Sequence, residues 1–343
     1  MKKTIWIMVV LLMLSGCRKS DTLLEQDDRS SYIEKQTGSS NEGNDDKSKA
    51  SSGIKEDETE IETSYVIQGE PFRKSVFTAG SDGVYLCGID TIGQYFLGHV
   101  LNEEQQLRRF SCKIPDGMRV VSIVCDHTGN AHVLLMSTSK TEINGEVLDQ
   151  LDYKRTEIWN IKSNGDIEEV KDVSKPLSGK INGIPRTFYV DPDGTYYLDA
   201  GGDIIILDKD GITTSYHTMG QRVTALGQGK SGKVYVTYFG EDGIERLTCM
   251  DWMDSGIELT GMEIATSKLS AGKENELLLY NKAGGVYALA DVESKEIHQL
   301  TGASTFPVSG DDVVGCDLMK DGRLCLLEVD DVKSIIHIIC IER

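Results

Sequence analysis

The chain has 343 residues and a formal net charge of −19, with 55 acidic residues against 36 basic ones. A protein this acidic repels phosphate backbones, which excludes nucleic acid as an expected partner. The length suits one large β domain or two domains of ordinary size.

The first residues, MKKTIWIMVVLLMLSGC, have the features of a bacterial export signal. Lys2 and Lys3 precede ten apolar residues from Ile5 to Leu14. Ten helical residues span about 15 Å, which is half of a bilayer core. The segment therefore directs export and does not remain as a membrane span.

The sequence Leu14-Ser15-Gly16-Cys17 resembles the lipobox of bacterial lipoproteins. In that family the cysteine that matches Cys17 is acylated and the peptide before it is removed. We therefore predict a signal peptide over residues 1–16 and a lipidated Cys17 that holds the protein on the extracytoplasmic side of the cell membrane. The alternatives are an ordinary secretory signal that contains a cysteine, or an uncleaved anchor.

Residues 17–62 form a polar segment rich in Ser, Asp, Glu, Lys, Asn and Gly, with Tyr32 as its one aromatic residue. Such a composition offers too little apolar surface to offset the entropy of ordering, so we predict a disordered linker. Its r.m.s. reach is roughly 35–40 Å. The linker therefore holds the folded part clear of the lipid headgroups.

Residues 63–343 contain a repeat in which a Gly or Asn turn leads into an apolar strand. The turn residues are Gly83, Gly129, Gly194, Gly232, Asn275 and Gly322, separated by 46, 65, 38, 43 and 47 residues. One apolar strand precedes each turn, and one or two more follow the turn-strand unit. This pattern predicts an all-β fold, a β-propeller of six four-stranded blades, with seven blades as the alternative. A β-sandwich or two small barrels would not explain the repeat.

The two ends of this region predict how the ring closes. The last repeat stops within its third strand at Arg343, and the strand-like segment Thr63–Gln68 has no place in the first repeat. We expect Thr63–Gln68 to pair with a strand from residues 334–343 as the outer strand of the sixth blade.

Seven cysteines follow Cys17, without a CxxC pair or a zinc-type spacing. Most lie among apolar strand residues, so we interpret them as buried thiols. Cys316 and Cys325 are the exception, because they can face each other across a turn at Lys320-Asp321.

Several short motifs resemble ligand sites, but we interpret them as turns. Gly227–Lys233 matches GxGxxG and part of a Walker A loop, yet a strand follows it where a helix is required, which argues against nucleotide binding. Asp191 and Asp208 begin Asp-rich turns that lack the remaining ligands of a calcium loop. The six histidines form no metal or catalytic motif. A triad assembled across blades leaves no local signature. We therefore predict no cofactor and no metal, and we name no catalytic residue.

Variable loops on a rigid scaffold are the usual place for recognition. In a propeller the second-to-third and fourth-to-first strand connections share one face, and here they include the insertion Ser137–Arg155. We call this face the variable-loop face. Its candidate binding residues are Asp90, Arg119, Tyr153, Arg186, Asp203, Arg222, Phe239, Glu241, Asp242, Asn281, Lys282 and Asp331. The alternative is that these are only solvated loop residues.

The order of lipobox, polar tether and repeats over 81–343 resembles that of Gram-positive surface lipoproteins with a propeller ahead of an extracellular solute-binding module. This chain ends where that module would begin, so its transport function does not carry over. The leading hypothesis is a membrane-anchored, non-enzymatic binding or scaffold propeller for a protein or carbohydrate ligand, accessory to solute capture. The alternatives are an extracellular carbohydrate-active or lyase-type propeller enzyme, and an assembly factor for envelope proteins.

Overall fold

The described secondary structure begins at Lys55. The computed structural model describes residues 55–68, 72–80, 83–143, 146–178, 187–199, 203–211, 213–217, 222–229, 232–251, 256–259, 268–271, 276–281, 286–301, 313–319, 321–329 and 333–342. All of these belong to the compact unit Gly53–Arg343. The export signal and Cys17 lie outside the described residues. No helix within the described ranges is long and apolar enough to cross a bilayer.

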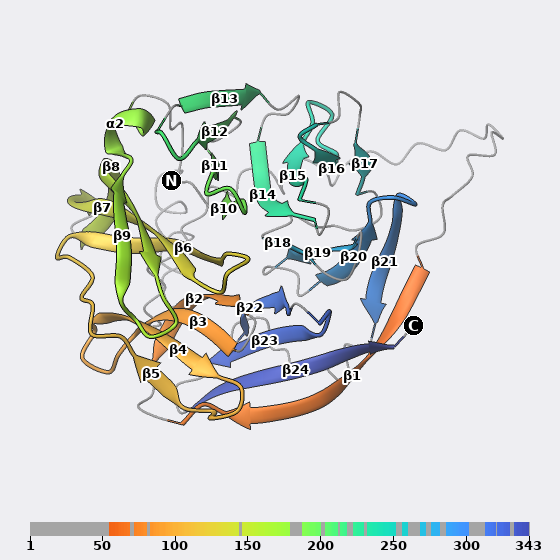
Figure 1. Cartoon of the computed structure of the whole chain (residues 1–343), viewed down its shortest axis with the longest axis horizontal. Helices are drawn as coiled ribbons and strands as arrows, with labels where there is room; N and C mark the ends of the chain where they lie inside the picture. The colour runs from red at the N-terminus through yellow and green to blue at the C-terminus, as the bar shows by residue number, and fades with distance from the viewer. Residues whose placement is uncertain are drawn as a thin grey trace, which may run out of the picture. The chain divides into compact units, whose positions relative to one another are not determined.

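Six antiparallel blades form a ring, which confirms the predicted fold class (Figure 1). Blade 1 contains β2 (Arg73–Ala79), β3 (Gly83–Ile89), β4 (Tyr95–Leu101) and β5 (Leu107–Arg109). Blade 2 contains β6 (Met118–Cys125), β7 (Ala131–Ile143), β8 (Glu146–Ile161) and β9 (Ile167–Asp172). Blade 3 contains β10 (Phe188–Val190), β11 (Tyr196–Asp199), β12 (Asp203–Leu207) and β13 (Thr213–His217).

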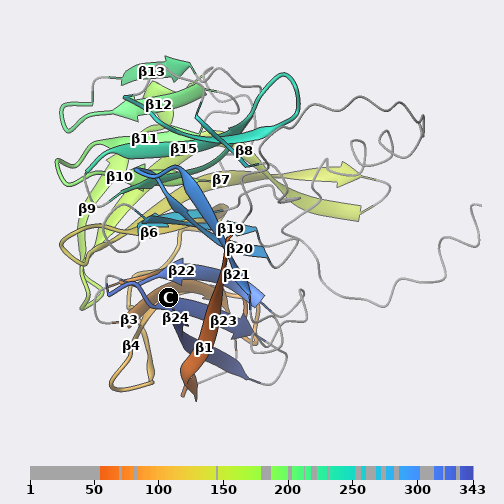
Figure 2. The ribbon, with the colours of Figure 1, turned by 90° about the vertical axis from the view of Figure 1, so that its right-hand side faces the viewer.

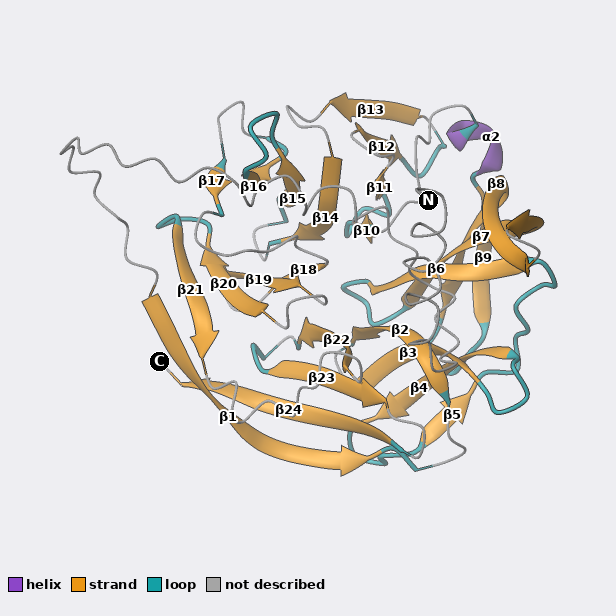
Figure 3. Cartoon of the chain, turned by 180° about the vertical axis from the view of Figure 1, so that it is seen from behind, coloured by secondary structure: helices purple, strands orange, loops and turns teal. Residues whose placement is uncertain are grey.

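The second half of the ring repeats this order. Blade 4 contains β14 (Arg222–Gln228), β15 (Val234–Phe239), β16 (Glu245–Cys249) and β17 (Ile257–Glu258). Blade 5 contains β18 (Lys268–Ala271), β19 (Glu276–Asn281), β20 (Val286–Asp291) and β21 (Glu296–Thr301). Blade 6 contains β22 (Val313–Leu318), β23 (Leu324–Val329), β24 (Ser334–Glu342) and, as its fourth strand, β1 (Lys55–Val66). A short helix, α2 (Ser174–Leu177), follows β9 (Figure 3).

The Asp-rich and Gly-rich motifs form turns, as predicted. The carboxylate of Asp191 accepts hydrogen bonds from the backbone N–H groups of Asp193 and Thr195, both at 2.9 Å. In the motif that resembles a nucleotide loop, the N–H of Gly229 donates to the carbonyl of Lys233 at 3.0 Å. Gly232 has a φ of 82° there, a conformation that glycine adopts without steric cost.

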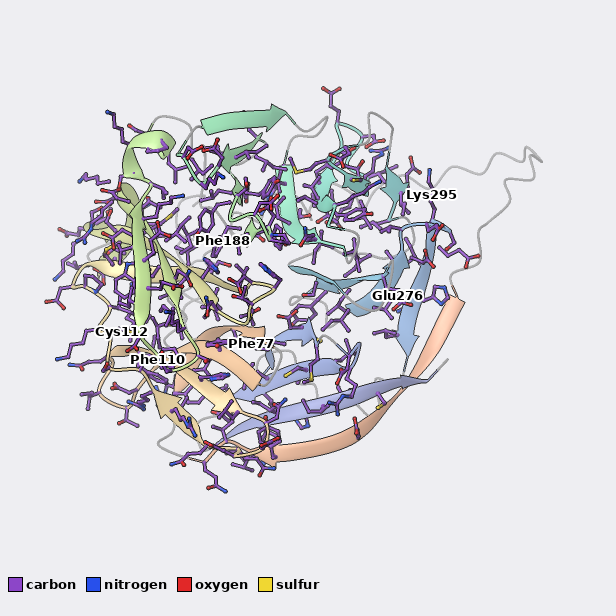
Figure 4. All side chains as sticks on the ribbon, in the orientation of Figure 1. Phe77, Phe110, Cys112, Phe188, Glu276 and Lys295 are labelled. Atoms are coloured by element: carbon purple, nitrogen blue, oxygen red, sulfur yellow. The ribbon has the colours of Figure 1, made fainter. Side chains whose placement is uncertain are left out.

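The hydrophobic core is divided among the seams between blades. Within the described residues there are six apolar clusters, each of which joins two neighbouring blades. Phe188, for example, is fully buried with Leu134 and Ile158 between blades 2 and 3 (Figure 4). Each such side chain contributes roughly 1.5–3 kcal/mol by burial. Successive residues of one strand point alternately toward the blade before and the blade after it, so both faces of a blade are apolar.

Strand β1 closes the ring, as the sequence predicted. It pairs antiparallel with β24 from Glu58 opposite Glu342 to Val66 opposite Ile335. The strand is longer than Thr63–Gln68, however, since it begins at Lys55. Residues 55–62 therefore belong to the propeller and not to the linker. Composition alone misplaced the boundary, because these polar residues form a strand by pairing their backbone with β21 and β24.

The added part of β1 also connects two blades. Lys55–Glu58 pair in parallel with β21 of blade 5, opposite His298 to Thr301. Blades 5 and 6 are thereby joined into one eight-stranded sheet.

Cys316 and Cys325, which the sequence allowed to face each other, do not do so. In the hairpin of β22 and β23, Cys316 lies opposite Leu326, and Cys325 lies opposite Asp317. The turn is centred on Asp321 and not between Lys320 and Asp321, which shifts the register by one residue. A shift of one residue moves a side chain to the other face of the sheet. Cys316 accordingly packs toward blade 5, and Cys325 toward blade 1.

Candidate functional site

The variable-loop face is dominated by a hairpin that the sequence had suggested only as an insertion. Strands β7 and β8 continue beyond the blade, with pairs from Thr138 opposite Leu151 to Ile143 opposite Glu146. Figure 2 shows this hairpin running out past the other strands. A bulge between Met136 and Thr138 marks the point where it leaves the blade. The insertion is therefore a projecting two-stranded hairpin, and Val147 near its tip is 64% exposed.

The base of the hairpin is fixed to the start of blade 2. The N–H of Thr138 donates to the carbonyl of Gly117 at 2.7 Å. The guanidinium of Arg119, at the start of the innermost strand β6, lies 3.4 Å from the carboxylate of Asp149 in the hairpin. Tyr95 of blade 1 lies near this ion pair, and burial raises the pKa of its hydroxyl. Arg119, Asp149 and Tyr95 thus form a cluster where blades 1 and 2 meet.

Asp90 forms the neighbouring loop of blade 1. Its carboxylate accepts hydrogen bonds from the N–H groups of Ile92 at 3.1 Å and Gln94 at 2.8 Å. Arg109 lies 3.5 Å from the other carboxylate oxygen and stacks 4.1 Å from the centroid of Phe96. Asp90 therefore shapes a loop that presents Ile92, which is 76% exposed.

The predicted residues of blade 4 form a separate group. Arg246 contacts Asp242 at 2.6 Å and Glu258 at 3.0 Å. The hydrogen bond from Arg246 holds the pKa of the Asp242 carboxyl well below its usual range. Glu241 is exposed beside this ion pair. Arg246 contacts the carboxylates of both Asp242 and Glu258, so these three side chains stabilise the loop.

The structure thus does not bring the predicted residues together in one cluster among those described. Arg222 lies opposite Phe239 at the start of blade 4. Asp203 lies opposite His217 in blade 3. Tyr153 lies in β8, but its side chain is outside the described set. Arg186, Lys282 and Asp331 lie outside the described residues, as does the side chain of Asn281.

A serine, a histidine and a glutamate that the sequence did not single out meet in blade 6. The hydroxyl oxygen of Ser64 lies 2.7 Å from Nδ1 of His337, and Nε2 of the same ring lies 3.0 Å from Oε2 of Glu328. His337 is 5% exposed, whereas Ser64 is exposed. The three residues come from β1, β24 and β23.

Strand register explains why Ser64 and His337 are so close. The N–H of Ile67 donates to the carbonyl of Ser334, which makes this a hydrogen-bonded pair. Hydrogen-bonded and non-hydrogen-bonded pairs alternate along an antiparallel ladder. Ser64 and His337 lie three positions from the hydrogen-bonded pair, so they form a non-hydrogen-bonded pair. Side chains approach more closely in such pairs. The predicted pairing of Thr63–Gln68 with residues 334–343 was the one sequence signal for this contact.

The described residues contain no candidate metal centre. Within the described ranges, no three or more His, Cys, Asp or Glu side chains are arranged to hold a metal ion. The described histidine side chains also lie outside the loops of the variable-loop face. His132, for instance, binds Asp126 at 3.0 Å beside the opposite face.

Comparisons with known proteins show the fold. No protein-family model matches the chain, and no curated protein matches it. The PQQ-bound aldose sugar dehydrogenase of Streptomyces coelicolor superimposes with a TM-score of 0.52 at 12% identity, over 83% of this chain and 98% of that one. A streptogramin B lyase gives 0.48 at 11% identity, over 83% and 98%. Virginiamycin B lyase from Staphylococcus aureus gives 0.48 at 10% identity, over 82% and 99%.

Proposed function

We propose that this protein is a lipid-anchored, extracytoplasmic binding propeller that holds a protein ligand on its variable-loop face without chemistry at that face. The β7–β8 hairpin is the observation that carries the proposal. It projects from blade 2, is fixed at its base by the Arg119–Asp149 ion pair, and exposes Val147. A hairpin whose strands are already paired needs less ordering on binding than an unstructured loop, which reduces the entropic cost of association.

Neighbouring features extend this surface. Ile92 in the next blade is 76% exposed, and the cluster of Arg119, Asp149 and Tyr95 lies where the two blades meet. Val147 and Ile92 give this face two exposed apolar contact points beside charged groups, a combination that a protein interface with an apolar centre and a polar rim can use. The lipobox at Cys17 supports the proposed anchor, and a role accessory to solute capture is the corresponding biological proposal.

Site-specific photo-crosslinking tests the proposal in the full-length protein in a bacterial host. A photoreactive amino acid at Val147 should give one defined adduct that mass spectrometry assigns to a protein partner. The matched control is Val170 in β9 of the same blade, which is 50% exposed but lies on the outer strand. Equal adducts at both positions, or none at Val147, would refute binding through the hairpin. Binding of a glycan array by the purified protein would instead assign the face to carbohydrate.

A further inference from the structure

We propose that Ser64, His337 and Glu328 form a nucleophilic site for carboxylic esters, separate from the variable-loop face. The contacts have the order that such chemistry requires. A hydroxyl lies within hydrogen-bond distance of an imidazole nitrogen, and a carboxylate lies within the same distance of the other nitrogen.

The carboxylate determines which imidazole nitrogen acts as the base. An ionised Glu328 only accepts hydrogen bonds, so in the neutral ring Nε2 carries the proton and donates it over 3.0 Å. Nδ1 then presents its lone pair to the hydroxyl of Ser64 at 2.7 Å. The side chains of His337 and Glu328 are only 7% and 18% exposed, so their orientation is fixed by packing. Ser64 itself is exposed and remains accessible to a substrate.

The backbone of β1 supplies hydrogen-bond donors beside the hydroxyl. Because Ser64 and His337 form a non-hydrogen-bonded pair, the N–H of Ser64 points away from β24. The N–H of Val66 points the same way. On that side, the described pairing with β21 covers only Lys55–Glu58. A backbone N–H next to the nucleophile can stabilise the oxyanion that forms during acyl transfer.

The reaction balances with these groups and water. The oxygen of Ser64 bonds to the acyl carbon as its proton passes to Nδ1 of His337. The tetrahedral intermediate then expels the alcohol, which takes that proton. Water attacks the resulting serine ester, His337 accepts the proton of the water and returns it to Ser64, and a carboxylic acid leaves. No oxidant or cofactor is required.

The test uses the purified full-length protein with a biotinylated alkyl fluorophosphonate. We expect one adduct on the peptide that contains Ser64, and slow release of nitrophenol from p-nitrophenyl acetate. H337Q should reduce the rate of labelling by about 100-fold or more, since a general base contributes roughly 10²–10⁴-fold. E328Q retains an acceptor oxygen but loses the charge, and should reduce the rate at least about tenfold.

The matched control is S174A. Ser174 donates to a carboxylate, that of Asp172, without an imidazole, so its loss should leave labelling unchanged. S64A should abolish the adduct. Melting curves verify that each variant is folded. If H337Q does not fold, the labelling rate of E328Q tests the proposal in its place. An unlabelled wild-type protein, an adduct on another serine, or unchanged labelling in a folded H337Q or E328Q would overturn the proposal. Crosslinking at Val147 does not depend on Ser64, so the two proposals can fail separately.

Discussion

Replacing Tyr65 by alanine tests whether β1 holds the ring closed. Tyr65 is 8% exposed and belongs to the cluster between blades 6 and 1, with Phe77, Leu327 and Ile336. Its hydroxyl donates to the side-chain oxygen of Asn102 in blade 1 at 3.0 Å. The residue therefore connects the N-terminal strand to both sides of the seam.

The structure gives the size of the expected effect. Truncating a buried aromatic side chain to alanine costs about 3–5 kcal/mol. At roughly 2–4 °C per kcal/mol, the value for large single domains, the melting temperature should fall by roughly 6–20 °C. Tyr65→Phe removes only the hydrogen bond and should cost about 1 kcal/mol. Val66→Ala is the matched control, because Val66 is the next residue of the same strand but is 50% exposed. Its cost should stay within about 0.5 kcal/mol.

Urea unfolding followed by tryptophan fluorescence, with light scattering in parallel, measures all three variants. We expect Tyr65→Ala to lower the midpoint and to increase aggregation, because a displaced β1 exposes the edge of β24. Equal midpoints for Tyr65→Ala and Val66→Ala would refute the reasoning, since the two faces of β1 would then be equivalent.

Three further predictions follow from the sequence and the seams. Cys17→Ser should release the protein from membranes or block its maturation; fatty-acid labelling that is equal in wild type and variant would contradict lipidation. Deleting residues 18–54 should change the melting temperature by no more than about 2 °C, since no described strand begins before Lys55, and a fall of about ten degrees would reveal a packed segment. Gly315→Ala should lower the free energy of unfolding, measured in urea, by about 1–3 kcal/mol. The reason is that the new Cβ would lie 2.9 Å from the ring of Phe77 across the seam of blades 6 and 1. An unchanged urea midpoint would show that the ring moves aside without cost.

The local chemistry of the repeats determined the architecture. Strands with apolar residues on both faces, separated by turns such as Asp191–Gly194, specify a blade without reference to the rest of the chain. Six such units leave six apolar seams, and the structure has one cluster in each. Because the last repeat lacks its outer strand and the strand-like segment Thr63–Gln68 has no place in the first repeat, the sequence also predicted the strand that closes the ring.

Only the tertiary structure decided how distant strands align. The polar residues Lys55–Glu58 carry no strand pattern, and they are ordered because the edges of β21 and β24 supply hydrogen bonds. One residue in the turn at Asp321 determined that Cys316 and Cys325 face opposite blades. Ser64 and His337 are separated by 273 positions. Their contact depends on the register of two strands from opposite ends of the chain. Side-chain alternation determines which face each residue takes, but no hairpin turn joins these two strands to fix their alignment.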